Sequence, residues 1–217
     1  MVFDKLIAAS KRMQRILEDN SVSNSQHPFD WPAITYKNPG VYRRADLDII
    51  DARLDRKLWM MHLCIYPKVS DPSPIYGFDI IAGPNKVTGA FHDFSPVAFD
   101  NPILTQFKEN VKPFIPSKRR ELPEWARNIF SDSMVSAGNV RDGKELDDIL
   151  ELAITNLEYY LTAIGEESDK DYTTQHNWYC ENQKKNPHTP RVMETLGVDP
   201  KRVREYIDEC LFPEIVN

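Results

Sequence analysis

Two ionisable residues, His62 and Asp79, lie inside apolar segments of this sequence rather than in its polar loops. His62 lies in the run Leu58–Tyr66 and Asp79 in the run Ile75–Ala82. A charged side chain in such a run has to face solvent, be paired, or line a cleft that shifts its pKa. An imidazole and a carboxylate that line one cleft can relay protons as general acid and base. A solvated sheet face remains the alternative for either residue alone, but the presence of both favours a pocket.

Strands are the elements that must position these two residues. Three apolar runs are rich in Ile, Val, Tyr and Phe and bounded by turn residues, as is typical of strands: Leu58–Tyr66, Ile75–Ala82 and Val87–Phe94. The turn Gly83-Pro84-Asn85 between the last two predicts a short hairpin. The sequence therefore predicts an antiparallel arrangement around His62 and Asp79.

A further strand is predicted over Val41–Ala52, whose residues alternate between apolar and polar. Asp46 and Asp48 would share one face of it, because side chains two residues apart in a strand point the same way. That face is either part of the site or simply in contact with water.

The spacing of apolar residues predicts helices before and after the central strands, over residues 3–19, 102–111, 143–164, 171–185 and 200–210. The clearest is residues 143–164, followed by Gly165 as a C-cap. Asn20–Gln26 is expected to be a loop, His27–Pro39 an irregular segment and Met134–Ala137 a short strand. The pattern predicts one α/β domain over residues 1–217, with an antiparallel sheet joined by hairpins.

Composition excludes several classes of protein. A formal net charge of -6 argues against a general nucleic-acid binder, which needs a basic surface. The three cysteines form no CxxC pair, and no run approaches the length of a membrane span or a secretion signal, so we expect a cytoplasmic protein. GxGxxG, P-loop, HExxH and GxSxG motifs are absent, and His62 with Asp79 lacks a third metal ligand at a telling spacing. The residues alone thus indicate acid–base chemistry without an evident cofactor.

One segment gathers positive charge, through Lys112, Lys118, Arg119 and Arg120. The simplest interpretation is a solvated loop. If the protein docks an acidic partner, these four residues are candidates for the contact.

Several stretches of the sequence together resemble the ferredoxin-dependent bilin reductases. The resemblance runs from about Tyr42 to Phe212 and is densest in MHLCIYP (61–67), PIYGFD (74–79), ELPEW (121–125) with IFS (129–131), and YCENQ (179–183). The order and spacing of these motifs carry the resemblance, since none is diagnostic alone.

The resemblance implies a three-layer α/β/α sandwich with a central antiparallel sheet, and a bilin held between that sheet and the C-terminal helices. It implies ferredoxin-dependent reduction of biliverdin IXα to a phycobilin through bilin radicals, with no bound metal or flavin. Electrons would arrive singly from a reduced [2Fe-2S] ferredoxin. The protein would be a monomer in the cytoplasm of a cyanobacterium or a virus-infected host cell.

The resemblance also suggests roles for individual residues. Asp79 matches the family's central aspartate, which helps to protonate the substrate, and His62 matches a histidine typical of the phycocyanobilin-forming branch. Asp48 falls near that branch's His-x-Glu motif, with a short insertion. Tyr76, Asn186 and His188 are candidate substrate contacts, and the four basic residues are candidate contacts for ferredoxin.

The main departure from the family lies at Lys185–Thr189, where most members carry a second aspartate and this chain has Asn186. An amide can hydrogen-bond but cannot deliver a proton. A branch known from marine viruses lacks this aspartate and forms phycoerythrobilin, so we favour that product, through 15,16-dihydrobiliverdin. Phycocyanobilin formation and a non-catalytic bilin carrier are the alternatives, and the retention of His62 and Asp79 favours an enzyme over a carrier.

Overall fold

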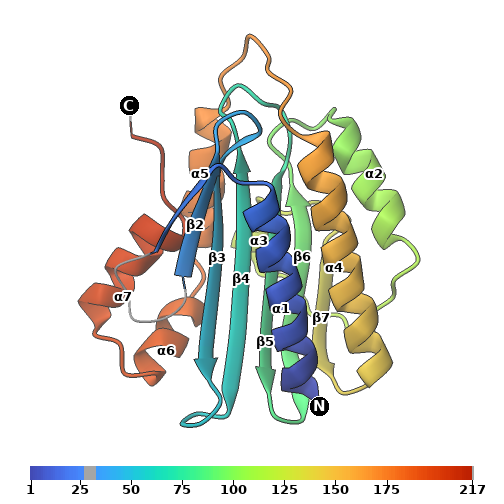
Figure 1. The fold of residues 1–217 in the computed structure, drawn as a ribbon, viewed down its shortest axis with the longest axis vertical. Coiled ribbons are helices and arrows are strands. Elements are labelled where there is room, and N and C mark those ends of the chain that lie inside the picture. The colour runs from blue at the N-terminus through green and yellow to red at the C-terminus, as the bar shows by residue number, and fades with distance from the viewer. Residues whose placement is uncertain (27–32, 217) are drawn as a thin grey trace.

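The centre of the protein is a seven-stranded antiparallel sheet, seen in a computed structural model that describes residues 1–26 and 33–216. Each strand pairs with the next one in the sequence, so that the order in space is the order in the chain (Figure 1). The strands are β1 (Ser23–Gln26), β2 (Ala33–Asn38), β3 (Tyr42–Ala52), β4 (Leu58–Pro67), β5 (Ile75–Gly83), β6 (Lys86–Ser95) and β7 (Val135–Val140).

Helices cover both faces of this sheet (Figure 1). One face is covered by α1 (Val2–Asp19), α2 (Pro102–Val111) and α4 (Gly143–Ala163). The other carries α3 (Glu124–Arg127), α5 (Thr173–Gln183), α6 (His188–Thr195), α7 (Pro200–Tyr206) and a π-helical turn, η1 (Ile207–Leu211). The predicted three-layer α/β/α sandwich is confirmed.

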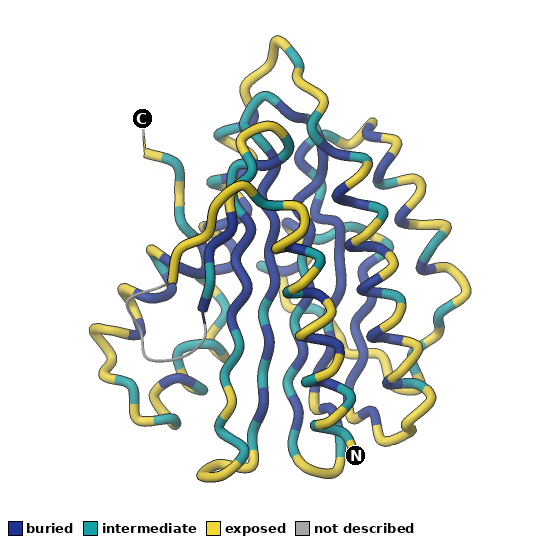
Figure 2. Tube along the Cα trace, in the orientation of Figure 1, coloured by how far each residue is buried: buried dark blue, intermediate teal, exposed yellow. Residues whose placement is uncertain are grey.

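The two faces of the sheet have different cores because side chains alternate along each strand. In β5, Tyr76, Phe78 and Ile80 pack in the larger core beneath α1 and α4. Asp79 and its same-face neighbours point to the other side, where the C-terminal helices pack. Figure 2 shows the strands buried along most of their length between these layers.

Local signals fix the ends of the main helices. Asn101 precedes Pro102 and its side chain accepts a hydrogen bond from the Ile103 backbone N–H, which caps α2. Asp142 caps α4 in the same way. Gly165, just beyond α4, has φ of 109°, a left-handed conformation that glycine adopts without steric penalty, as expected from the sequence.

Three expectations from the sequence need correction. Ser23–Gln26, expected as a loop, is strand β1, an edge strand whose side chains are all exposed and so show no apolar alternation. Part of the segment expected to be irregular is strand β2, while residues 27–32 of it lie outside the described residues. Helix α6 was not expected either, because its apolar stripe is short and it begins directly after Pro187.

No helix in residues 1–26 and 33–216 is long and apolar enough to cross a membrane.

Candidate active site

A single row of residues crosses the sheet and brings together side chains from five strands. The register pairs Asp48 of β3 with His62 of β4, His62 with Asp79 of β5, and Asp79 with Phe91 of β6. Phe91 in turn pairs with Ser136 of β7. Directly paired residues project from the same face of a sheet, so the three ionisable side chains line up as neighbours. The sequence placed them on strands, and the register makes them one site.

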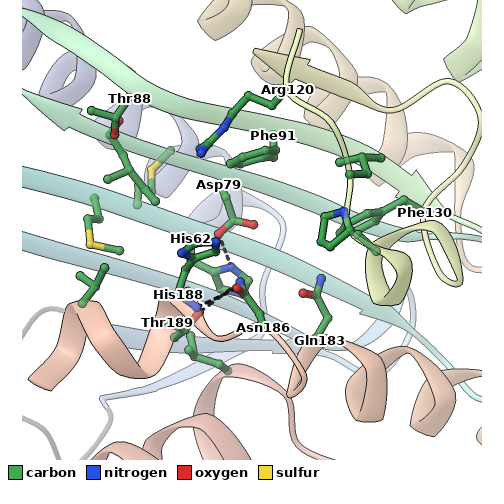
Figure 3. Close-up of a pocket in the computed structure, with 18 of the residues that line it drawn as sticks. His62, Asp79, Thr88, Phe91, Arg120, Phe130, Gln183, Asn186, His188 and Thr189 are labelled. Carbon is green, nitrogen blue, oxygen red and sulfur yellow. Dashed lines mark hydrogen bonds and ion pairs between the residues drawn. The ribbon is translucent and has the colours of Figure 1, made fainter. Parts of the chain in front are cut away.

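His62 and Asp79 form the centre of the row. His62 Nδ1 lies 2.7 Å from Asp79 Oδ1 (Figure 3). The imidazole is 12% exposed and the carboxylate 41%, so the histidine is shielded by protein while the aspartate opens onto the adjoining cavity. The pocket expected around these two residues is present, and the two side chains are paired within it.

The charge of His62 follows from this pairing. Burial of the imidazole lowers its pKa, but the charge and hydrogen bond of Asp79, helped by the charges of Asp48 and Asp46 on β3, outweigh burial and raise the pKa of His62 to about 9. At neutral pH the ring is therefore a cation with two N–H groups. Nδ1–H donates to Asp79, whereas Nε2 is buried and has no hydrogen-bond partner among the described residues. A substrate with an acceptor atom at Nε2 would satisfy this group.

Asp46 and Asp48 share a face as predicted, but that face is covered rather than wet. Asp48 is 3% exposed, lines the cavity and accepts a 2.7 Å hydrogen bond from the hydroxyl of Tyr206 on α7. Asp46 is fully buried and accepts hydrogen bonds from the Thr35 hydroxyl and from Arg44 Nε. Arg44 also donates to the carbonyl of Cys210 in η1, so Asp46 serves to anchor the C-terminal turn. Asp48 is the one of the pair that can reach a bound molecule.

The cavity in front of this row has a volume of about 780 Å³, within the range of roughly 300–1,000 Å³ typical of small-molecule sites. The sheet forms its floor, and α3, α6 and the C-terminal turn form its walls. Its apolar lining includes Ile50, Met60, Ile81, Trp125, Phe130, Met193 and Leu211. The ring of Phe212 meets that of His62 edge-on, with centroids 5.5 Å apart, and helps to exclude water from it. Large aromatic walls around a few polar groups suit a flat, mostly apolar ligand.

Asn186, in the turn between α5 and α6, and His188, the first residue of α6, both line the cavity (Figure 3). Asn186 Oδ1 accepts a 3.0 Å hydrogen bond from the His188 backbone N–H, and its amide lies 3.4 Å from the Thr189 hydroxyl. The asparagine therefore orders the start of α6 as well as facing the pocket.

Two of the candidate residues are placed differently from what the sequence suggested. Tyr76 is fully buried on the opposite face of the sheet, with its hydroxyl donating 2.9 Å to the Ala153 carbonyl of α4, so its expected contact with substrate is wrong. The reason is the alternation of β5, which turns Tyr76 away from the face that Asp79 occupies. The four basic residues do not act as one group: Lys118, Arg119 and Arg120 line the cavity, while Lys112 lies at the end of α2, pairs with Glu109 and is not part of the lining.

Sequence reasoning missed Phe91, Tyr206 and Phe212 as parts of the site. Phe91 carries a usable signal, because it lies in a hairpin with Asp79 across a short turn. Tyr206 and Phe212 carry none, since they reach the row from more than a hundred residues away in the chain. No cluster of three or more side chains that could hold a metal ion occurs in the part of the chain that the structure describes.

A sequence model of the family described as "Ferredoxin-dependent bilin reductase" matches residues 35–213. The chain belongs to this family of oxidoreductases, which act on bilins. Its fold and the resemblance found in its motifs agree with that membership.

The similar curated proteins carry the name of one particular enzyme of this family. The chain is 32% identical over 181 residues to "Phycocyanobilin:ferredoxin oxidoreductase" of Prochlorococcus marinus strain MIT 9313, an alignment that covers 79% of this chain and 67% of that protein. It is 29% identical over 180 residues to the protein of the same name from Synechococcus sp. strain CC9605, covering 78% of this chain and 71% of the relative.

Two solved structures share the fold. The structure of a protein named PcyX superposes with a TM-score of 0.70 at 32% identity and covers 97% of this chain and 99% of its own. Phytochromobilin synthase from tomato, solved in complex with biliverdin, has a TM-score of 0.70 at 13% identity, covering 93% and 82% of the two chains. The tomato protein shows the shared fold alone.

Proposed function

We propose that this protein reduces biliverdin IXα to a phycobilin, taking four electrons singly from reduced [2Fe-2S] ferredoxin and adding four protons. The protein in this proposal binds no metal or flavin of its own. The observation that carries the proposal is the His62–Asp79 pair, which presents a cationic imidazole and a partly open carboxylate in the centre of a bilin-sized cavity. Because electrons come from outside, the chain's task is to hold the substrate and to supply protons at fixed positions.

Each of the ionisable residues has a part in this scheme. Asp79 faces the cavity, where its carboxylate can accept hydrogen bonds from the pyrrole N–H groups of the substrate. When protonated, it can donate a hydrogen bond to a lactam oxygen. His62 Nε2–H lacks a partner in the described structure and can donate a proton to a bilin radical anion after an electron arrives. Asp48 lies next in the row and is a third proton carrier at the opposite end from Phe91.

Phycoerythrobilin, formed through 15,16-dihydrobiliverdin, is the favoured product. The turn over the cavity carries Asn186 where a second acid would protonate the A-ring, so the first protons come from His62 and Asp79 near the centre of the tetrapyrrole. The chain also matches the PcyX protein over almost the full length of both. Formation of phycocyanobilin is the alternative, and the names of the relatives from Prochlorococcus and Synechococcus favour it.

An anaerobic assay with biliverdin and reduced ferredoxin tests the proposal, with products separated by chromatography at early and late times. We expect an early 15,16-dihydrobiliverdin and a final phycoerythrobilin. An exovinyl-reduced intermediate followed by phycocyanobilin would select the alternative product. Bound biliverdin that is never reduced would contradict the proposed reaction.

Replacing Asn186 by aspartate should redirect the product. An aspartate keeps the side-chain oxygen that accepts from His188 N–H, so the turn is retained while a proton donor is added over the cavity. We expect part of the product to become A-ring-reduced, measured by chromatography beside the parent. The Asn186→Ala variant is the control, because it removes the amide without adding an acid and should leave the product identity unchanged. Identical products from the aspartate variant and the parent would mean that Asn186 has no part in this choice.

Lys118 and Lys112 offer a matched test of where ferredoxin docks. Both are exposed lysines of one segment, but only Lys118 borders the cavity that electrons must reach. Ferredoxin is acidic, and opposite charges speed association in a way that salt screens over a Debye length of about 8 Å at physiological ionic strength. We expect Lys118→Glu to raise the KM for ferredoxin and flatten the salt dependence of turnover, and Lys112→Glu to do neither. Equal effects of the two variants would place docking elsewhere.

A further inference from the structure

Arg120 lies across the edge of the sheet in a slot formed by two glycines. Gly89 of β6 and Gly138 of β7 are directly opposite each other in the register. A methyl group on Gly138 would lie 2.7 Å from Arg120 Cγ and 2.9 Å from its Cδ. One on Gly89 would lie 2.9 Å from Arg120 Nη1 and also 2.9 Å from Cε2 of the Phe91 ring. Real Cβ contacts are not this short, so the side chain occupies the space that two missing side chains leave.

The glycines are required for space and not for backbone conformation. The described glycines with positive φ are Gly165 and Gly197, so neither Gly89 nor Gly138 adopts the left-handed region. Glycine inside a strand weakens it and often marks a close approach by another part of the chain. Here the approaching group is a charged side chain.

The root of Arg120 is fixed to the sheet as well. Its backbone N–H donates to the Ser136 carbonyl at 3.1 Å, and its carbonyl accepts from the Ser136 hydroxyl at 2.9 Å. Arg119 forms a β-bridge with Ala137 beside it. Because Ser136 pairs with Phe91, this attachment puts Arg120 at the end of the row that contains Asp79 and His62.

The guanidinium of Arg120 lies over the Phe91 ring, and no acidic side chain among the described residues forms an ion pair with it. Its Cζ lies 5.7 Å from the centre of the Phe91 ring, and Figure 3 shows the two side chains together beside Asp79. No ion pair or side-chain hydrogen bond of Arg120 is formed within the described residues, although Glu121 lines the same cavity. A planar guanidinium fixed over an aromatic ring, with its donors free, is suited to a carboxylate, which it can bind through two parallel hydrogen bonds.

We propose that Gly89 and Gly138 are positioning residues, because the slot that they form directs the Arg120 side chain toward a carboxylate of the substrate. The contact between Arg120 and that carboxylate would fix the position of the substrate relative to His62 and Asp79. This proposal rests on the proposed function, since biliverdin supplies the propionate carboxylates. A second cavity, of about 630 Å³, adjoins the first and is also lined by Arg120. A guanidinium displaced from the slot therefore has room to turn away, so filling the slot should misdirect the side chain while the protein still folds.

The test is a double-mutant cycle on biliverdin binding, measured by absorbance titration with Gly138→Ala, Arg120→Ala and the combined variant. A hydrogen-bonded charge contributes about 1.5–3 kcal/mol, so each single variant should bind about 10- to 100-fold more weakly than the parent. The combined variant should bind no more weakly than Arg120→Ala alone, because the glycine acts only through the arginine. Biliverdin dimethyl ester, which lacks the carboxylate charges, should bind equally to all of them.

Two further variants keep the result interpretable. Gly83→Ala is the matched control, since the nearest atom to its added methyl is 3.8 Å away, and it should bind like the parent. Gly89→Ala fills the other half of the slot and replaces Gly138→Ala in the cycle if that variant does not fold. Every protein of that second cycle then carries Phe91→Ala, because the Gly89 methyl would also meet the Phe91 ring. Parent-like binding by the slot variants, or the same loss in the Arg120→Ala background or with the ester, would overturn the proposal. A parent that binds biliverdin without reducing it contradicts the proposed function alone, whereas a parent that does not bind it overturns both.

Discussion

Asp79→Asn should lower turnover of biliverdin by about 10²–10⁴-fold, the usual contribution of a positioned general acid or base. The amide keeps the volume of the side chain and its hydrogen bonding, but it removes the ionisable group that faces the cavity. It also removes the main charge that raises the pKa of His62, so the imidazole would no longer hold its second proton as firmly at neutral pH. One substitution thus weakens two members of the row.

The measurement is single-turnover reduction with saturating ferredoxin, together with a binding titration. Binding of biliverdin should stay within a few-fold of the parent, because the cavity walls are unchanged. Asp51→Asn is the matched control: Asp51 lies on β3 of the same sheet but is exposed and paired with Arg53, so its variant should turn over normally. Parent-like turnover by Asp79→Asn would remove Asp79 from the mechanism.

The stability of the protein should fall as pH rises from about 6.5 to 9, through the titration of His62. The pKa of His62 is about 9 in the folded protein, against 6.5 for an unperturbed histidine. A group with a raised pKa in the folded state binds its proton more tightly there, so its stabilisation is complete below pH 6.5 and is lost as pH rises through 9. The shift corresponds to about 3 kcal/mol of unfolding free energy.

Urea unfolding of the parent and of His62→Gln at pH 6, 7.5 and 9.5 isolates this contribution. Other groups titrate in both proteins and cancel in the difference, whereas the histidine titrates only in the parent. We expect the parent's advantage over the variant to shrink by about 3 kcal/mol between the first and last pH. A constant difference across this range would mean that His62 is not held as a cation by Asp79.

These two predictions concern neighbours in one row, and the same geometry explains why the C-terminal segment matters to the site. Tyr206 donates to Asp48 and Phe212 covers His62, so the last turns of the chain contact two of the three ionisable residues. The turn is itself held by Arg44 and by Tyr66, whose hydroxyl donates to the Leu211 carbonyl at 3.0 Å. π-Helical turns are rare and are found frequently at functional sites, and η1 is placed where it can hold both contacts.

The sequence by itself determined the central strands, the longer helices and the importance of His62 and Asp79. Those features depend on local patterns: β-rich runs between turn residues, apolar stripes at helical spacing, and charges inside apolar segments. The motifs were also sufficient to indicate the family. Edge strand β1 was not predicted, because it buries no side chain and its formation depends on pairing with β2.

Only the tertiary structure decided how these residues meet. The register put Asp48, His62 and Asp79 side by side, and a shift by one residue would have turned them to opposite faces, as the alternation of β5 turns Tyr76 away. The covering of Asp48, the slot beneath Arg120 and the separation of Lys112 from the other basic residues all depend on contacts between segments distant in the chain. A pattern in the sequence records the environment of each residue along its own element, and the packing of elements against one another determines which residues share a site.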